Sequence, residues 1–277
     1  LISMPAIRNN VIESNAFYNT YPLPLYLGSA QGAVTLLQND DFTIDGNILR
    51  GNTAAQGAAI YGASCAAGRI QNNLILHNWA YDPTAFGGTG GGIYWTVIPG
   101  ATGTVSILHN TFAGNIATNS FSEQGGGLTF VLTENSNRLV IANNLLASNS
   151  SGLYQIPSSP LTRPILERNN LINIRSNYLN LPPGPSDLSV APAFIGNGDW
   201  RLRPDSLCVD VGTSAHTIAF DQSGIPRPLD GNNDGVPGPD LGAFETVHPQ
   251  SDSDGDRMPD AWELDNALNP VADDAAA

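Results

Sequence analysis

The segment IQNNLILHN, Ile70–Asn78, contains a pattern that recurs along most of this 277-residue chain. Its two key asparagines, Asn73 and Asn78, stand five positions apart with aliphatic residues between them. The same spacing occurs at Asn10/Asn15, Asn47/Asn52, Asn110/Asn115 and Asn144/Asn149. A sixth copy is expected to start at Asn170, with Arg175 in place of its second asparagine. Repetition at this scale predicts a solenoid, in which each unit buries its apolar face on its neighbours.

The runs between the asparagines have the composition of strands. Branched aliphatic residues such as Ile44, Ile48 and Val105 lie in short runs that glycine or asparagine soon interrupts. Strands favour this composition, and no part of the region keeps a helical apolar stripe for three turns. Asparagines repeated at one place in each turn can hydrogen-bond one another, and asparagine tolerates the left-handed backbone of a sharp corner. We therefore predict an all-β chain of stacked parallel strands.

Glycine-rich motifs follow the asparagine pairs. They are GAAIY at Gly57–Tyr61, GGGIYW at Gly90–Trp95 and GGGLTF at Gly125–Phe130, and FAGN stands at Phe112–Asn115. These motifs resemble the GGAI and FxxN repeats of polymorphic outer-membrane proteins and of other β-helix proteins of bacterial surfaces. The resemblance covers about residues 1–198 and implies a right-handed parallel β-helix.

Charge is distributed unevenly along the chain. All 11 basic residues are arginine, and the formal net charge is −14. Residues 1–198 carry 7 Arg and 9 acids, whereas residues 199–277 carry 4 Arg and 16 acids. An acidic surface argues against nucleic acid as a partner and favours cations. No run of 18 apolar residues is present, so we predict no membrane span.

Past residue 190 the composition changes. The segments APAFIGNGDWRLRPDSLCVDVGT and DQSGIPRPLDGNNDGVPGPDLGAFE resemble the closing coils of the choice-of-anchor Q family of β-helix proteins. Residues that match that family's pattern include Pro192, Phe194, Cys208, Asp210, Arg227 and Glu245, whereas Leu207 replaces a proline. The resemblance implies a bacterial cell-surface or extracellular protein. We predict a β-helix over 1–247, capped by coils from about residue 190, and a separate tail over 248–277.

The tail contains the clearest candidate metal site. In DSDGDRMPDAWE, the residues at the ligand positions of an EF-hand-type loop are Asp252, Asp254, Asp256, the carbonyl of Met258, Asp260 and Glu263. Arg257 replaces the usual glycine at the sixth position. Whether the chain makes the sharp turn of a calcium loop at this position is therefore a question for the structure. The loop resembles the thrombospondin type 3-like calcium repeats of bacterial surface proteins. We expect Ca²⁺ here, because closely spaced carboxylates repel one another without a cation.

A second candidate calcium site precedes the tail. Asp230, Asn232 and Asp234 match the first half of a calcium loop, and Asp240 follows. The second half lacks the bidentate glutamate, so this site is left open between a calcium loop and an ordinary turn.

Aromatic residues gather in three apparent insertions. Tyr21 and Tyr26 lie in the first, and Trp79, Tyr81 and Phe86 in the second. Exposed aromatic rings can stack on sugars, and repeat proteins often bind through insertions on one face. The alternative is that these rings fold inward and pack their own loops.

Candidate catalytic residues are few. The acid cluster of the repeat region is Asp40, Asp41 and Asp45, and a strand would place Asp41 and Asp45 on one face. With Arg50 or Arg69 they could serve a polysaccharide lyase or glycoside hydrolase; otherwise they are solvated residues at a strand entrance.

Two functions remain open at this point. The first is a non-catalytic surface protein that forms a coat, an adhesive contact or a fibre of copies joined end to end, because Leu1 begins in the middle of a coil and an uncapped coil exposes strand edges. The second is a polysaccharide-degrading or polysaccharide-binding protein. Because the chain also ends without a structural closure, we expect a piece of a larger secreted protein. Cys65 and Cys208 are expected as buried thiols, with a disulfide as the alternative.

Overall fold

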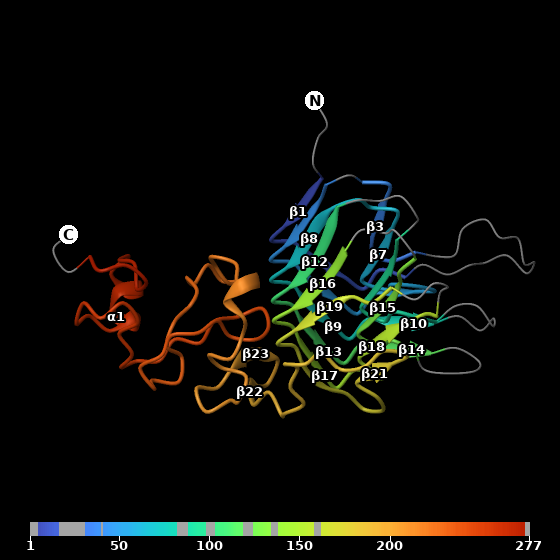
Figure 1. The fold of residues 1–277 in the computed structure, drawn as a ribbon. Coiled ribbons are helices and arrows are strands. Elements are labelled where there is room, and N and C mark those ends of the chain that lie inside the picture. Colours follow the sequence, from blue (N-terminus) through green and yellow to red (C-terminus); the bar gives the residue numbers. More distant parts are fainter. Residues whose placement is uncertain are drawn as a thin grey trace, which may run out of the picture.

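The chain folds as a right-handed parallel β-helix in the computed structural model (Figure 1), which describes residues 5–16, 31–39, 41–81, 88–97, 103–118, 124–133, 138–157 and 162–274. Sheet A contains β1 (Ala6–Arg8), β4 (Thr43–Asp45), β8 (Gly68–Gln71), β12 (Thr104–Leu108), β16 (Arg138–Ala142) and β19 (Ile165–Glu167). Sheet B contains β2 (Val11–Glu13), β5 (Ile48–Arg50), β9 (Leu74–Leu76), β13 (Thr111–Ala113), β17 (Leu145–Ala147) and β20 (Asn170–Ile172).

Two further sheets complete each coil. Sheet C contains β6 (Thr53–Ala54), β10 (Trp79–Tyr81) and β14 (Ile116–Thr118). Sheet D contains β3 (Val34–Leu37), β7 (Ile60–Ala63), β11 (Ile93–Thr96), β15 (Leu128–Val131), β18 (Leu153–Gln155) and β21 (Tyr178–Leu179). In three of the described coils the chain passes through sheets A, B, C and D in turn, and in the others it passes from B to D without a strand of sheet C, before returning to sheet A one coil further along. The predicted all-β parallel architecture is therefore confirmed.

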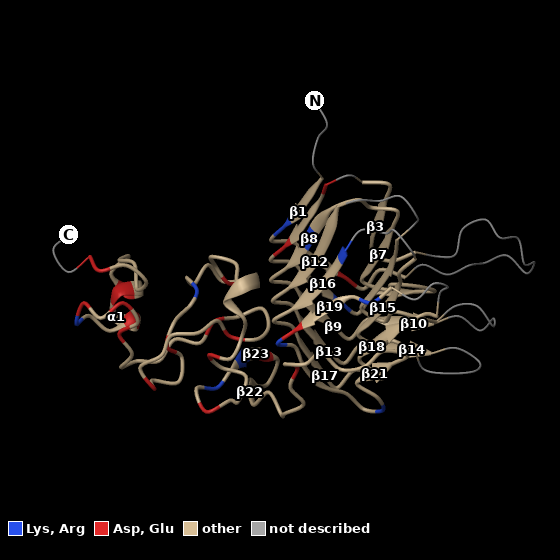
Figure 2. Ribbon diagram, viewed as in Figure 1, with Lys and Arg blue, Asp and Glu red and all other residues tan. Residues whose placement is uncertain are grey.

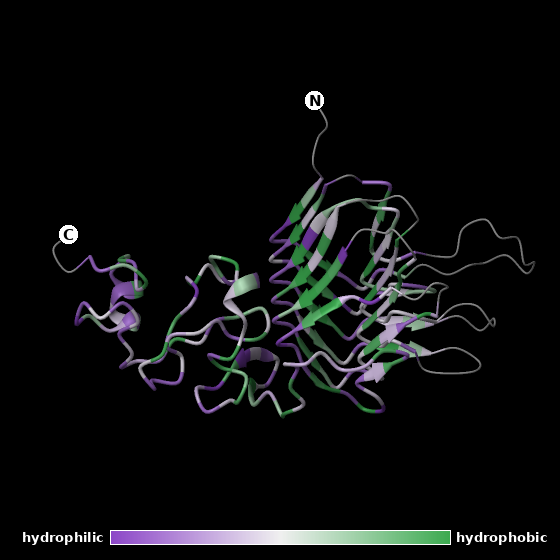
Figure 3. Ribbon diagram, viewed as in Figure 1, coloured by the Kyte–Doolittle hydropathy of each residue, from purple (hydrophilic) through white to green (hydrophobic). Residues whose placement is uncertain are grey.

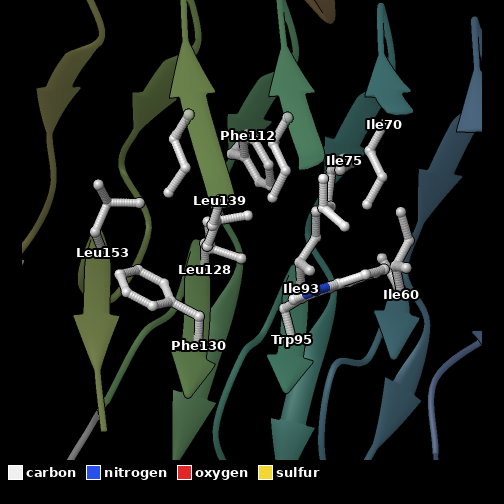
Figure 4. Packing of buried hydrophobic residues seen from close by; sticks show 14 of the residues in the cluster. Ile60, Ile70, Ile75, Ile93, Trp95, Phe112, Leu128, Phe130, Leu139 and Leu153 are labelled. Atoms are coloured by element: carbon white, nitrogen blue, oxygen red, sulfur yellow. The ribbon is translucent and has the colours of Figure 1, made fainter. Parts of the chain in front are cut away.

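The core consists of equivalent side chains stacked from coil to coil. In sheet A, Ile44 pairs with Ile70, which pairs with Ile107, and all three are buried. Sheet D contributes the largest buried side chain, Trp95, which lies opposite Gly62. Figure 4 shows these side chains of sheet D facing those of sheets A and B across the interior. Parallel strands that bury the same position in every coil explain the short aliphatic runs of the sequence.

Two columns of buried asparagines hold the coils in register. The Oδ1 atom of Asn110 accepts from the backbone N–H and the side-chain amide of Asn73, at 3.0 and 2.9 Å. The side-chain amide of Asn110 donates to the Ile70 carbonyl at 2.8 Å and also to Asn144. The first column comprises Asn10, Asn47, Asn73, Asn110, Asn144, Asn169 and finally Asp187. The second comprises Asn15, Asn52, Asn78, Asn115, Asn149, Asn173 and Asn177.

The sixth repeat differs from the sequence prediction. Asn169, not Asn170, continues the first column, and Asn173 takes the second position where Arg175 was expected. Asn170 instead exchanges two hydrogen bonds with the backbone of Val190, in the segment that covers the last coil. The two asparagines of this repeat therefore stand four positions apart and not five.

Residues 190–247 do not continue the coils, contrary to our expectation. They form a lobe with an antiparallel pair, β22 (Phe194–Gly196) and β23 (Asp199–Leu202), and a 3₁₀ turn, η1 (Ser214–His216). Figure 1 shows this lobe beside the β-helix, with the tail further out. The segment lacks the asparagine columns, and carboxylates take their place: Asp240 and Glu245 accept hydrogen bonds from buried backbone N–H groups.

The lobe docks on the corner between sheets A and B. Each coil passes this corner through a residue with a left-handed backbone: Asn9, Gly46, Asn72, His109, Asn143 and Arg168. The Asn143 side chain accepts from the Thr213 N–H at 2.8 Å and donates to the Thr213 carbonyl at 3.0 Å. Asn72 donates to the Phe220 carbonyl at 2.9 Å. The lobe therefore contacts several coils along one edge of the β-helix.

The tail begins beyond the lobe and contains one short helix, α1 (Asp260–Asp265). Figure 2 shows acidic residues gathered in the lobe and the tail, while Figure 3 shows apolar residues concentrated in the strands. Across the described ranges, the structure contains no helix with the length and apolarity needed to cross a membrane. Cys65 and Cys208 are both buried thiols, and no disulfide joins them.

Candidate functional site

The tail loop curls around its own carboxylates. Asp252 accepts from the N–H groups of Gly255 and Arg257, at 2.8 and 2.9 Å. Asp254 accepts from the N–H of Asp256 at 3.1 Å. Arg257 adopts a φ of 79° at the position where calcium loops usually have glycine. The sharp turn therefore forms with arginine in that place.

The loop gathers its acids into two groups that share Asp256. Carboxylate oxygens of Asp252, Asp254 and Asp256 lie within 4.8 Å of one another, and so do those of Asp256, Glu263 and Asp274. Glu263 is completely buried, and neither of its carboxylate oxygens has a hydrogen-bond partner in the described part of the chain. One oxygen each of Asp254, Asp256 and Asp274 is buried and unpartnered in the same way.

This arrangement is unfavourable without a cation. Burial, followed by the negative charges of Asp254, Asp256, Asp260 and Asp274, raises the pKa of Glu263 to about 7. Buried carboxylates are normally hydrogen-bonded or bound to a metal, because desolvation of an unpaired charge is costly. A set of carboxylate oxygens is the donor set that calcium prefers, so the residues fit this cation.

One predicted ligand, Asp260, has other partners in the structure. Asp260 accepts from both the backbone N–H and the hydroxyl of Ser253, at 2.7 and 2.6 Å, and belongs to neither group of acids. The N–H of Met258 donates to Asp256 at 2.8 Å. Asp274 was not predicted, because the comparison with a calcium loop stopped at Glu263. The second aspartate of the sequence NPVADD is the signal that could have indicated it.

The second candidate calcium site is not assembled in this way. Asp230 accepts from the N–H groups of Asp234 and Gly235, as the residues of an ordinary turn do. Asn232 also accepts from the Asp234 N–H. Asp240 is fully buried and accepts from the N–H groups of Asp210 and Thr246. Within the described residues, Asp230, Asp234 and Asp240 form no group of acids close enough to share a cation.

The predicted catalytic acids lie along the outer face of sheet A. Asp41 lines a groove of about 690 Å³ together with Arg8 and Arg69. Asp45 lines an adjoining groove of about 620 Å³, which Arg69 also borders and which the lobe residues 217–224 close. Arg50 lies on sheet B, where it forms an ion pair with Glu13. Of the two candidate arginines, Arg69 is therefore the one that lines the grooves.

The predicted aromatic residues divide into two sets. Trp79 and Tyr81 lie on β10 of sheet C and not in an insertion, with 42% and 40% of their surface exposed. Their ring centroids are 5.0 Å apart. Tyr21, Tyr26 and Phe86 fall outside the described residues.

Comparison with known proteins addresses the coil region. A family described as right-handed beta helix region matches residues 3–178. No curated protein matches the chain, and no solved structure does. The matched residues include all the strands of sheets A to C and the asparagines of both columns, but not Asp187. The chain therefore belongs to the right-handed β-helix family.

Proposed function

We propose that this is a secreted or cell-surface structural protein whose C-terminal tail binds calcium. The observation that carries the proposal is Glu263, a buried carboxylate without a hydrogen-bond partner among the described residues. Its carboxylate lies within 4.8 Å of carboxylate oxygens of Asp256 and Asp274, and Asp254 belongs to the adjoining group that shares Asp256. A calcium ion bound here would neutralise the repulsion between these groups and hold the two ends of the tail together.

Three further observations support the extracellular and structural parts of the proposal. Extracellular calcium modules work at affinities of about 10⁻⁴–10⁻³ M, and a short loop of this kind suits such conditions. Residues 191–245 resemble a family of bacterial surface proteins. Within the coils, the buried asparagines form hydrogen bonds from one coil to the next, an arrangement that suits a structural protein.

The two ends of the β-helix bear on self-association. At the last coil, Leu188 pairs with Asn170, and Val190 bonds to the same residue, so this end is covered. At the first coil, β1 and β2 have no partner strand on their outer side within the described residues. The covered last coil disfavours fibres in which the last coil of one copy meets the first coil of the next.

Calcium binding should be lost when Glu263 is replaced by glutamine. Glu263→Gln removes one charge and one oxygen ligand from the centre of the site, so we expect calcium affinity to fall by about tenfold or more. Isothermal titration calorimetry of the whole chain measures this directly. Asp265→Asn is the matched control, since Asp265 is an exposed acid on the same helix.

Two results would contradict the calcium proposal. One is the absence of binding by the native protein at millimolar calcium. The other is equal affinity for the native protein and Glu263→Gln. Limited proteolysis provides an independent readout, because chelation should expose residues 252–274 to cleavage while the coils stay intact.

A second candidate function rests on the grooves of sheet A. Within the described residues, the guanidinium groups of Arg8 and Arg69 form no ion pair or hydrogen bond, although the chain is strongly acidic. Arginine binds carboxylates in a planar, bidentate manner, so unpaired arginines beside Asp41 and Asp45 would suit an acidic polysaccharide. The Asp45 carboxylate could then move a proton during cleavage.

This candidate predicts cleavage of uronic-acid polysaccharides by the native protein. Asp45→Asn should lower the rate by about 10²-fold or more, because it removes the proton-transferring group. Arg69→Ala should weaken substrate binding, whereas Arg50→Ala, on another sheet, should have no effect. Product release followed by viscometry measures the rate. Intact polysaccharide with native protein, or equal rates for native and Asp45→Asn, would exclude this function.

A further inference from the structure

Sheet C reverses the usual placement of large and small apolar side chains. Its inward column consists of Ala54, Ala80 and Ala117, all completely or almost completely buried. Its outward face carries Trp79, Tyr81 and Ile116, which are 42%, 40% and 42% exposed. The large side chains therefore contribute little to the core. In a sheet built for stability alone, they would lie inside.

The exposed rings are held in place by their neighbours. Trp79 lies opposite Thr53 on β6 and Ile116 on β14. Its indole N–H donates to the Thr118 hydroxyl at 2.9 Å, across to the neighbouring strand. Tyr81 lies opposite Thr118, and its ring centroid is 5.0 Å from that of Trp79. A side chain held in one orientation loses little conformational entropy when a ligand binds.

We propose that this face, which we call the sheet C platform (Thr53, Trp79, Tyr81, Ile116 and Thr118), binds uncharged polysaccharide. The apolar C–H face of a pyranose ring stacks on an aromatic ring, and the threonine and tyrosine hydroxyls lie beside it to bond sugar hydroxyls. No residue of β6, β10 or β14 is charged. The platform therefore suits a neutral glycan and offers nothing to pair with an acidic one.

Size favours a sugar over a protein as the ligand. Three strands at a spacing of about 4.8 Å make a platform only about 10 Å across. A stable protein–protein interface buries about 800 Å² on each partner, which is far more than these side chains offer. A few sugar rings match the platform better. This inference does not depend on the calcium site or on the grooves of sheet A, because the platform lies on a different sheet.

Affinity electrophoresis tests the proposal with the whole chain. Native gels are cast with hydroxyethylcellulose, xyloglucan, glucomannan or galactomannan, and one gel contains polygalacturonate. We expect retardation of the native protein in at least one neutral-glycan gel, and any retardation by polygalacturonate should be the same for native protein and Trp79→Ala. Trp79→Ala should weaken the affinity by about 30-fold or more, as expected when an aromatic anchor is removed.

Controls separate binding from folding. Trp262→Ala removes another exposed tryptophan, 49% exposed on α1, and should be retarded like the native protein. Tyr81→Ala provides a second platform variant should Trp79→Ala lower the melting temperature. Three results would overturn the proposal: no retardation by any neutral glycan, equal retardation of native protein and both platform variants, or a dimer in light scattering that Trp79→Ala dissociates.

Discussion

Replacing Asn110 with leucine is expected to lower the free energy of unfolding by roughly 3–5 kcal/mol. Asn110 is completely buried, and its Oδ1 atom is the acceptor for the backbone N–H of Asn73. Leucine would leave that N–H buried without a partner. It would also remove the donor to the Ile70 carbonyl and to Asn144. Each orphaned group costs about 1–3 kcal/mol, and the losses occur at one corner.

Asn10→Leu is the matched control for this prediction. Asn10 occupies the same place in the first coil, but it is exposed and begins the column. Water can replace its lost hydrogen bonds, so we expect a change of about 1 kcal/mol or less. Urea unfolding followed by circular dichroism measures both variants. An equal loss of unfolding free energy in the two variants would mean that a buried asparagine of the column contributes no more to stability than an exposed one.

Replacing Trp95 with alanine should cost about 3–5 kcal/mol. Trp95 is fully buried, and its ring lies 5.4 Å from that of Phe42, centroid to centroid. Gly62, the residue opposite it one coil earlier, provides the space, since a Cβ atom there would overlap the indole ring. Alanine would leave a cavity in the centre of the core that the stacked strands cannot close.

Trp95→Phe separates packing from hydrogen bonding. The indole N–H of Trp95 is buried and has no acceptor among the described residues. Phenylalanine keeps most of the ring and removes this unsatisfied donor, which itself costs about 1–3 kcal/mol. We therefore expect Trp95→Phe to differ from the native protein by about 1.5 kcal/mol or less in urea unfolding. A loss as large as that of alanine would show that the N–H group is bonded in solution.

The coils could be predicted because the same pair of asparagines recurs in each of the first five. An asparagine such as Asn73 bonds to Asn110, its equivalent one coil later, and although the interval from coil to coil varies, the two asparagines of each of these coils stand five positions apart. The last repeat was misassigned because Asn169 and Asn170 are adjacent and only the structure shows which one meets Asn144. The lobe could not be predicted. Its position depends on contacts such as that of Thr213 with Asn143, for which no spacing rule exists.

The candidate sites were predictable to different degrees. The loop acids Asp252, Asp254 and Asp256 follow from local spacing, and the structure brings them together. Asp274 lies beyond the loop and joins it only because the chain folds back after α1. The sequence indicates Trp79 as a candidate aromatic residue, but not that its ring is exposed. Its exposure depends on strand register, which places Ala80 inside and Trp79 outside. Periodicity of two across a strand of three residues is too short to reveal this from sequence.

The direction of the asparagine columns determines how the molecule could change length. Every member of the first column donates to the next, and Asp187, which has no amide to donate, ends the series. Each interior coil therefore presents the same acceptor on one side and the same donors on the other. Deleting or duplicating one complete coil, such as residues 73–109, would leave both ends of the column chemically unchanged. The rod could therefore gain or lose whole coils while Asp187 still ends the column.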